Sequence, residues 1–438
     1  MLNASITKKS KWRRIIGALT LDVSPLRVSR DYRLLFTGQL VSGFGSAMSY
    51  VVLPFQMYQL TKSSLAVGML GVAEFVPMLT LGFVGGALAD YFDRRKLLWI
   101  AEVGLMLCVG VLIFNSLLAS PKVWVLFMAS ALFAALNALH RPAMEALTPK
   151  IVAAEFMPAV AALNSLRFNF SFILGPAVGG VLAASFGVAL AYGVDLVTYV
   201  VSLAALLLMR AVPPPEDPDR PSLQSVIDGL RYARSRQELL GTYLIDLNAM
   251  FFGMPMALFP AMAESYGSAS VGLFYSMPSI GALCATLTSG WTARIRKHGL
   301  AITIAASVWG LAIVGAGLAK HLWLGLFFLA LAGCADMISG LFRMTLWNQT
   351  IPDYLRGRMA SIEMISYTTG PYLGNAEAGI VASLFGLRAS VVSGGVLCVA
   401  GSALLAMFLP RFIRYDREEG LARKEIDEAA RAVSGVEV

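Results

Sequence analysis

Three carboxylates stand inside long apolar stretches of the sequence, where an ionised side chain is costly: Glu74 in LGVAEFVPML, Asp336 in LAGCADMISG and Glu377 in GNAEAGIVAS. Burial favours the neutral form of a carboxylate, so such a group can take up a proton and release it when its surroundings change. We expect at least one of the three to exchange a proton in this way. The alternative is a buried ion pair, for example with Arg167, that stabilises the fold.

Further residues in apolar stretches are candidates for lining a ligand cavity. Arg167 is the basic residue that we place well inside such a stretch, where it could pair with a carboxylate or attract an anion. For Asp246 and Glu363 the alternative is solvation near a membrane surface. Aromatic side chains would suit a bulky, partly apolar ligand, although packing is the alternative for each. These aromatic candidates are Phe55, Tyr58, Phe168, Phe251, Phe252 and Tyr367.

The sequence offers little that an enzyme would need. The cysteines Cys108, Cys284, Cys334 and Cys398 stand apart with no CxxC spacing, so neither a zinc site nor a disulfide framework is expected. The histidines His140, His298 and His321 are scattered, and no GxxxxGK[ST] phosphate-binding loop occurs. We therefore expect no metal, no cofactor and no catalytic activity.

Composition indicates that these residues are carried by membrane-spanning helices. Hydrophobic residues make up 57% of the 438 and charged residues 14%, against roughly 25% charged in soluble domains. A spanning helix needs about 20 mostly apolar residues. Twelve stretches qualify: 34–60, 66–89, 97–118, 123–147, 159–184, 187–210, 239–263, 270–293, 300–319, 322–347, 359–384 and 387–409. We predict an all-α membrane protein with twelve transmembrane helices.

The distribution of basic residues predicts the orientation of these helices. If both termini are cytosolic, only Lys62, Lys122, Lys320 and Arg388 of the 35 Lys and Arg fall in loops on the opposite side. The short apolar stretch IIGALTL near the N-terminus is too short for the core of a signal peptide. We expect a multi-pass protein of the bacterial inner (plasma) membrane with both termini cytosolic. Anionic lipid headgroups then account for the net charge of +8, without nucleic acid.

A repeat divides the chain into two halves. GPAVGGVLAASFG (175–187) and GNAEAGIVASLFG (374–386) match at six positions with identical intervals and end in the same Phe-Gly pair. Such tandem repeats occur where two transporter halves face each other across a central site. We predict a cytosolic N-terminal segment (1–33), a six-helix half (34–210), a cytosolic linker (211–238), a second six-helix half (239–410) and a cytosolic tail (411–438).

The stretch GGALADYFDRRKLL (85–98) places five charges between two apolar stretches. This stretch resembles the GxLaDrxGrRr loop of the major facilitator superfamily. The matching residues are Gly86, Asp90, Arg94, Arg95 and Lys96, and Asp93 stands where that pattern has its second glycine. The resemblance implies a cytosolic latch, in which the basic cluster holds a carboxylate or a helix C-terminus of the other half. The alternative is an orientation signal alone. The corresponding stretch 289–299 has Arg294 where the carboxylate would stand.

Other stretches resemble one branch of this superfamily. Residues 24–70, 259–291 and 348–365 are similar to siderophore exporters of the drug:proton antiporter branch, and GPAVGG (175–180) resembles the antiporter signature of span five. The resemblance implies the major facilitator fold, with two pseudo-symmetric six-helix halves. Spans 3, 6, 9 and 12 are then peripheral, so Glu102 and Asp195 are expected to be structural or interfacial.

The same resemblance implies a function. It is proton-coupled export, by alternating access, of a siderophore or similar amphiphilic small molecule. A multidrug or macrolide efflux pump is the alternative, and a non-transporting membrane receptor on the same scaffold is a further one. The expected partners are the substrate, protons and membrane lipids. The sequence does not reveal the oligomeric state, and we favour a monomer.

Overall fold

The computed structural model describes residues 22–91, 93–210, 231–352, 355–418, 420–422, 424 and 426. The N-terminal half begins with the short helix α2 (Ser24–Val28). Its long helices are α3 (Arg30–Thr61), α4 (Ser64–Tyr91), α5 (Arg94–Leu117), α6 (Val123–Ile151), α7 (Met157–Phe186) and α8 (Val188–Leu208), with the turn η1 (Ala154–Phe156) before α7.

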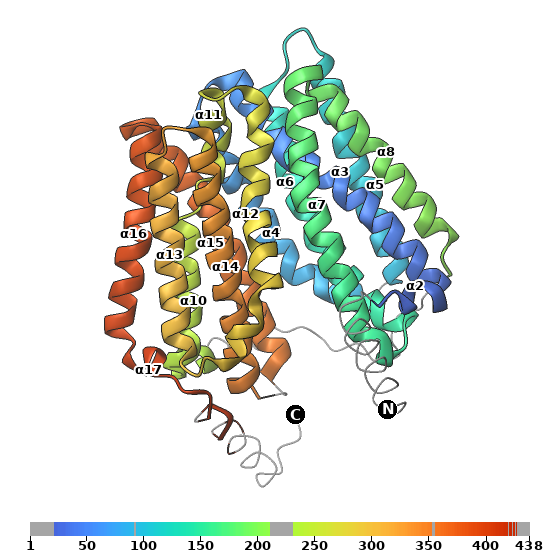
Figure 1. Cartoon of the computed structure of the whole chain (residues 1–438). Coiled ribbons are helices and arrows are strands. Elements are labelled where there is room, and N and C mark those ends of the chain that lie inside the picture. Colours follow the sequence, from blue (N-terminus) through green and yellow to red (C-terminus); the bar gives the residue numbers. More distant parts are fainter. Residues whose placement is uncertain are drawn as a thin grey trace, which may run out of the picture.

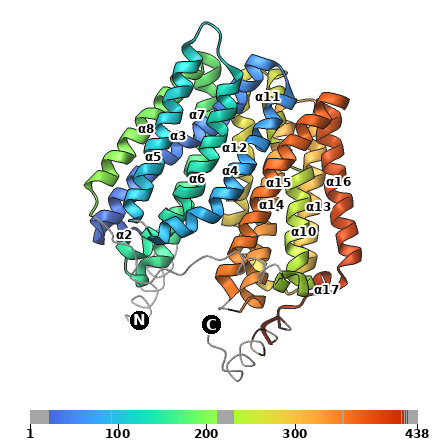
Figure 2. The same cartoon turned by 180° about the vertical axis from the view of Figure 1, so that it is seen from behind.

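The C-terminal half repeats this plan with one broken helix. Its elements are α10 (Gln237–Phe252), η2 (Met256–Leu258), α11 (Phe259–Glu264), η3 (Ser268–Ser270), α12 (Val271–Leu287), η4 (Ser289–Arg294), α13 (His298–Leu318), α14 (Leu322–Thr350), α15 (Arg356–Phe385), α16 (Leu387–Phe408) and α17 (Pro410–Ile413). The two halves lie side by side and approach each other most closely at the end that carries α11 (Figures 1 and 2). We call this the closed end, and the end that carries α2 and α17 the open end.

The helices are long enough to cross a membrane. Among the described residues, 11 helical segments reach the length and hydropathy of a membrane span. The helix α15 spans 30 residues and packs among them, against α4, α10 and α16. It is less apolar because it carries Glu363, Asn375 and Glu377. The chain is a multi-pass membrane protein, and the predicted twelve-helix, all-α fold is confirmed.

Two of the predicted spans are interrupted in the structure. The seventh, predicted over 239–263, corresponds to the span Gln237–Glu264, which is broken into α10 and α11. The break follows Gly253, and Pro255 has no N–H to continue the hydrogen bonds of the helix. The eighth, predicted over 270–293, ends as an α-helix at Leu287 and continues as the turn η4. The other ten agree with the structure to within a few residues.

The backbone confirms the internal repeat. The junction between α7 and α8 is Gly187, with φ 91° and ψ 154°, and the junction between α15 and α16 is Gly386, with φ 91° and ψ 156°. These φ/ψ values lie close to a region that is almost exclusive to glycine. The two residues that end the sequence repeat thus make the same turn in both halves.

At the closed end the two halves meet through glycines. A Cβ on Gly180 of α7 would lie 2.7 Å from the Cα of Gly272 in α12. A Cβ on Gly68 of α4 would lie 3.1 Å from the Cα of Gly379 in α15. The fifth helix of each half therefore packs on a helix of the other half, as the repeat requires. Of the predicted segments, residues 1–21 and 211–230 and most of the tail beyond 418 lie outside the described residues.

Candidate functional site

A cavity of about 580 Å³ lies between the two halves. Helices α3, α4, α6, α7 and α8 line it on one side, and Met254, η2, α12 and α15 line it on the other. Such interfaces between repeats are where transporter substrates bind. The residues that line the cavity are Ser46, Ser49, Tyr50, Leu53, Pro54, Val67, Leu70, Gly71, Glu74, Met78, Phe133, Asn137, Arg141, Phe172, Tyr199, Met254, Met256, Ala257, Tyr275, Tyr367, Thr368, Pro371, Tyr372 and Asn375.

Aromatic and methionine side chains make up ten of the 24 residues in this lining. The ring of Tyr50 makes edge-to-face contacts with Phe172 and Tyr275, with centroid distances of 6.2 and 5.9 Å. The flexible thioethers of Met254 and Met256 can adapt to ligands of different shape. A lining of this kind suits a bulky ligand with aromatic or other apolar surface.

Glu74 is the one predicted proton carrier that faces the cavity. Its Oε1 accepts a hydrogen bond from the Ser130 hydroxyl of α6. The described contacts of Glu74 include no basic side chain. Ionised, it would be an unpaired charge within a membrane-spanning helix, which favours the protonated acid.

The other two predicted proton carriers lie outside the cavity lining. Asp336 is on α14, 3.8 Å from Arg343, and its side chain is 42% exposed. The same guanidinium pairs with Asp246 of α10, whose side chain is 8% exposed. Glu377 of α15 is half-buried and takes part in none of the hydrogen bonds described for the chain. Asp246 and Asp336 are therefore members of one ion-pair cluster around Arg343.

Arg167 is not alone among basic residues inside a long helix, because Arg141 lies in α6 and Arg343 in α14. Both arginines already fall inside the predicted spans 123–147 and 322–347, and the two helices extend further, to Ile151 and Thr350. Arg167 itself lies beside Tyr32 of α3, and its Nε has no hydrogen-bond partner among the described residues. It contacts none of the three predicted proton carriers.

Arg141 joins the two halves across the cavity. Its Nη1 donates to the Tyr367 hydroxyl at 2.7 Å, its guanidinium lies 5.1 Å from the centre of that ring, and its Nε pairs with Glu145 at 3.0 Å. Tyr367 is predicted from the sequence to line the cavity, and in the structure it does so. Phe133, Asn137 and Arg141 follow one another at intervals of four on α6, a spacing that places them on one helix face. That spacing is the feature of the sequence that could have identified this face of α6 as part of the cavity lining.

The remaining cavity candidates lie away from its lining. Phe168 is 57% exposed and stacks on Phe172 at 4.5 Å, and Phe251 packs edge-on against Phe252 at 4.9 Å. Glu363 of α15 is electrostatically coupled to Arg343 and Arg141, so it connects the ion-pair cluster to the cavity wall.

Tyr58 belongs to a clamp at the closed end. Its hydroxyl donates to Glu264 Oε2 at 2.8 Å, while Lys62 Nζ binds Oε1 at 2.6 Å. Tyr58 and Lys62 belong to α3 and its cap, and Glu264 ends α11, so this contact joins the two halves. Both ionic partners are more than half exposed, at 63% for Lys62 and 51% for Glu264.

The predicted latch makes its described contacts within its own half. Asp93 caps α5, because its carboxylate accepts hydrogen bonds from the backbone N–H groups of Arg95 and Lys96. The Arg95 guanidinium donates to the Leu206 and Leu207 carbonyls at the end of α8, both at 2.7 Å. In this conformation the halves are separated at the open end, and Arg95 binds the end of α8 in its own half. A partner in the other half, expected when the open end closes, stays a prediction. The side chains of Gly86 and Asp90 lie outside the described residues.

No group of three or more potential metal ligands occurs in the part of the chain that the structure describes.

Comparisons with known proteins agree with this architecture. The profile of a family described as transmembrane secretion effectors matches residues 20–434. The enterobactin exporter EntS of Citrobacter koseri is 29% identical over 394 residues, which cover 88% of this chain and 94% of that protein. The exporter of the same name from Escherichia coli is 28% identical over 396 residues, covering 89% and 94%.

Solved structures share the fold at low identity. A bacterial homologue of the lysosomal transporter Spinster, in an inward-facing and unoccupied conformation, aligns with a TM-score of 0.67 at 14% identity over 90% of this chain and 97% of that one. A bacterial homologue of the iron transporter ferroportin, in an inward-facing state, aligns with a TM-score of 0.66 at 16% identity over 87% and 98%.

Proposed function

Because the chain belongs to the transmembrane secretion effector family of the major facilitator superfamily, we propose that it exports a small amphiphilic molecule, a siderophore or a similar compound, in exchange for protons. The relatives named as enterobactin exporters, which align along nearly the whole chain, support export. The proposed location is the inner membrane of a bacterium, with both termini in the cytosol.

The observation that carries proton coupling is the position of Glu74. It is a carboxylate without a described cationic partner, and it borders the cavity that lies between the two halves. When substrate or water enters the cavity, the surroundings of this group change, and with them the balance between acid and carboxylate. Proton release and substrate binding can be coupled at one place in this way.

The closed end supports alternating access. The glycine contacts and the clamp of Tyr58, Lys62 and Glu264 join the halves at the end with α11. The helix α2, which follows the N-terminal segment, lies at the other end (Figure 1). With that segment in the cytosol, this conformation is inward-facing and ready to accept substrate. Export then requires the glycines at the closed end to move apart and the latch residues at the open end to come into contact with the other half.

The lining supports an aromatic and anionic substrate. Arg141 offers a cation beside Tyr367, and several further tyrosine and phenylalanine rings surround the cavity. Siderophores with catecholate groups combine aromatic rings with negative charge. The same adaptable Met and aromatic surface also suits a macrolide or another drug, which keeps multidrug efflux as the second candidate.

The test uses purified protein in proteoliposomes. An imposed pH gradient should drive accumulation of an iron-free catecholate siderophore, and a protonophore should abolish it. Preferential accumulation of a macrolide would identify the second candidate instead. Accumulation that follows a sodium gradient and ignores the pH gradient would refute proton coupling.

A further inference from the structure

Helix α8, expected at the periphery, presents a row of polar side chains to α3. Each side chain of the row contacts a polar side chain of α3. The pairs, in order along α8, are Tyr192 with Gln56, Asp195 with Ser49, Tyr199 with Ser46, and Ser202 with Gln39. The Tyr192 hydroxyl donates to Gln56 at 3.0 Å, and the Tyr199 and Ser46 hydroxyls are 2.8 Å apart. Buried polar rows in a membrane protein are costly and mark candidate functional sites.

Asp195 is the carboxylate in the middle of this row, and it is completely buried. The Ser49 hydroxyl donates to its Oδ2, and the Thr198 hydroxyl lies 3.2 Å from Oδ1. A Cβ on Gly45 of α3 would collide with both Asp195 Oδ1 and the Thr198 hydroxyl, so the two helices are in direct contact here. The site can hold a proton, but the contact leaves little room for a hydrated metal ion.

No basic side chain faces Asp195 among the described contacts of the helices packed on it. Its titratable neighbours are Tyr192 and Tyr199 of α8 itself. On α5, Glu102 and Cys108 are coupled to Tyr199. The neighbours on α3 are the neutral Ser49 and Gly45. The charged residue of α7, Arg167, lies beside Tyr32, several turns before Ser49 on α3. An ionised Asp195 would have two hydroxyl groups and no counter-charge, so the protonated acid is favoured in this conformation.

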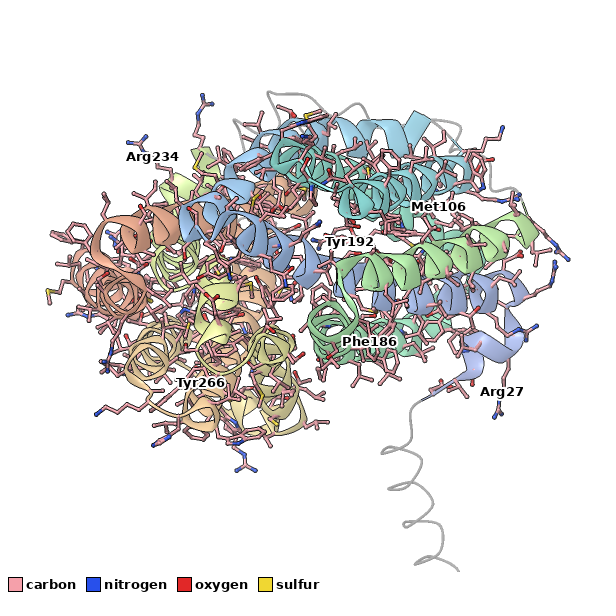
Figure 3. The ribbon with its side chains drawn as sticks, turned by 90° about the horizontal axis from the view of Figure 1, so that it is seen from above. Arg27, Met106, Phe186, Tyr192, Arg234 and Tyr266 are labelled. Atoms are coloured by element: carbon pink, nitrogen blue, oxygen red, sulfur yellow. The ribbon has the colours of Figure 1, made fainter. Side chains whose placement is uncertain are left out.

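The surroundings of Asp195 connect it to the cavity and separate it from the closed end. Ser49, Ser46 and Tyr199 all line the cavity, so one hydroxyl separates the acid from the cavity space. Toward the closed end, the fully buried Tyr192 lies one turn before Asp195 and is fixed by its bond to Gln56. Figure 3 shows Tyr192 from that end, near the centre of the molecule.

The buried carboxylate Glu102 provides a contrast within the same half. Its Oε1 receives hydrogen bonds from Gln39 and from Ser202, the latter at 2.9 Å, and His140 lies 3.5 Å away. None of these three partners lines the cavity. Glu102 therefore has a potential counter-charge and no direct connection to the cavity, whereas Asp195 has the connection and no counter-charge.

We propose that Asp195 is a second proton-binding site of the transport cycle, which exchanges its proton with the cavity through the Ser49 hydroxyl. This inference rests on the proposed proton-coupled export. In the step itself, the Ser49 hydroxyl turns its hydrogen from Asp195 toward cavity water. Its oxygen then accepts the Asp195 proton as its own proton passes to the water, which leaves an aspartate, an intact serine hydroxyl and a hydronium ion. Opening of the closed end, with displacement of Tyr192 from Gln56, allows reprotonation from the other side. Glu74 and Asp195 then bring the number of exchanged protons to two.

The first test measures the protonation state directly and needs no transport. Infrared difference spectra of the purified protein, recorded between neutral and alkaline pH, should show the carbonyl band of a buried carboxylic acid. Asp195→Asn should remove that band, and Ser49→Ala should shift it because one hydrogen bond to the acid is lost. Persistence of every acid band in Asp195→Asn overturns the proposal. If Asp195→Asn does not fold, acid bands that Ser49→Ala leaves unmoved overturn it equally.

The second test counts protons per exported substrate in proteoliposomes. Asp195→Asn should lower the ratio by one, while the control variant Glu102→Gln should keep the wild-type ratio. Glu102→Gln removes a buried carboxylate that has no direct connection to the cavity. An unchanged ratio in Asp195→Asn overturns the second site. If wild-type protein shows no proton coupling at all, the proposed function fails, and the infrared result remains a separate measurement.

Discussion

At the scale of single residues, neighbours decide what each buried carboxylate can do. Glu74 and Asp246 both lie in membrane-spanning helices, yet Glu74 accepts a bond from a serine while Asp246 binds the guanidinium of Arg343. A carboxylate beside an arginine stays ionised, whereas one beside hydroxyl groups can change its charge. Glu74 is therefore suited to titration, and Asp246 to holding α10 and α14 together.

Replacing Glu74 by Gln should abolish export driven by a pH gradient, with a loss of at least about tenfold, a difference worth roughly 1.4 kcal/mol. Gln keeps the shape and can still contact Ser130, but it cannot titrate. Substrate binding and substrate counterflow, which need no net proton movement, should persist. Transport in proteoliposomes and thermal unfolding should be measured together. A stable Glu74→Gln protein that still accumulates substrate in response to a pH step would exclude Glu74 as a proton carrier.

Replacing Asp246 by Asn should destabilise the fold instead. Removal of one partner from a buried ion pair leaves the other charge unpaired and costs about 3–5 kcal/mol. Asp336→Asn is the matched control, because Asp336 lies 3.8 Å from the same guanidinium and is much more exposed. We expect a clear drop in melting temperature for Asp246→Asn and a smaller one for Asp336→Asn. Equal melting temperatures for the two variants would contradict the ion-pair geometry.

Sequence reasoning located some of these residues and missed others for a physical reason. Apolar surroundings were sufficient to identify Glu74, because charges are rare in a spanning helix. They failed for Arg141 and Arg343, because positive charges near the end of an apolar stretch also occur in cytosolic loops. The role of Asp195 depends on contact between α3 and α8, and residues 146 positions apart in sequence give no local sign of it.

At the scale of elements, the turns between paired helices are nearly identical in the two halves. Gly187 and Gly386 both have φ 91°, and each links the fifth helix of its half to the sixth. The repeat, the number of helices and most helix ends followed from apolar length and glycine positions. The break between α10 and α11 did not, because Gly253 and Pro255 lie within a continuous apolar stretch.

Gly187→Ala should destabilise the protein by about 1–3 kcal/mol, since alanine must adopt a backbone conformation that glycine alone adopts easily. Gly386→Ala should behave in the same way. Gly193→Ala is the control, because this residue lies within α8 with open space around its Cα, and alanine is the better helix former. Denaturation of all three variants in detergent tests the expectation. A loss of stability in Gly193→Ala that matches the other two would show that the backbone conformation of the two turns is not responsible.

At the scale of the whole molecule, two sets of contacts at the closed end hold this conformation. The glycine contacts are buried, while the clamp of Tyr58, Lys62 and Glu264 is exposed. Exposed ion pairs add little to stability, but this one links the two halves and breaks when they separate. It therefore acts on the balance between conformations more than on folding.

Glu264→Gln should shift the population toward the form that is open at the α11 end. Distances between spin labels placed on α3 and α11 report this population. Lys62→Gln, which removes the other ionic partner, should give a shift in the same direction. Lys320→Gln is the control, because Lys320 is a basic residue outside the clamp. Distance distributions identical to wild type in both clamp variants would show that the glycine contacts alone hold the closed end.

The orientation in the membrane can be tested through the linker. Ser222→Cys, in a background without the four native cysteines, should resist a membrane-impermeant thiol reagent in intact cells. Permeabilised cells should label fully, because the linker is then accessible. Labelling of intact cells would place the linker outside the cytosol and reverse the direction that we assign to transport.

The seal between the halves consists largely of main chain, and this affects how such an exporter can evolve. Gly180 meets Gly272 and Gly68 meets Gly379, and these contacts do not depend on the side chains that line the cavity. Mutations at Tyr372, Phe172 or Met254 can therefore remodel the cargo preference while the barrier stays intact. Selection for a new cargo and selection against leakage then act on separate sets of residues, which makes a change of cargo possible in single steps.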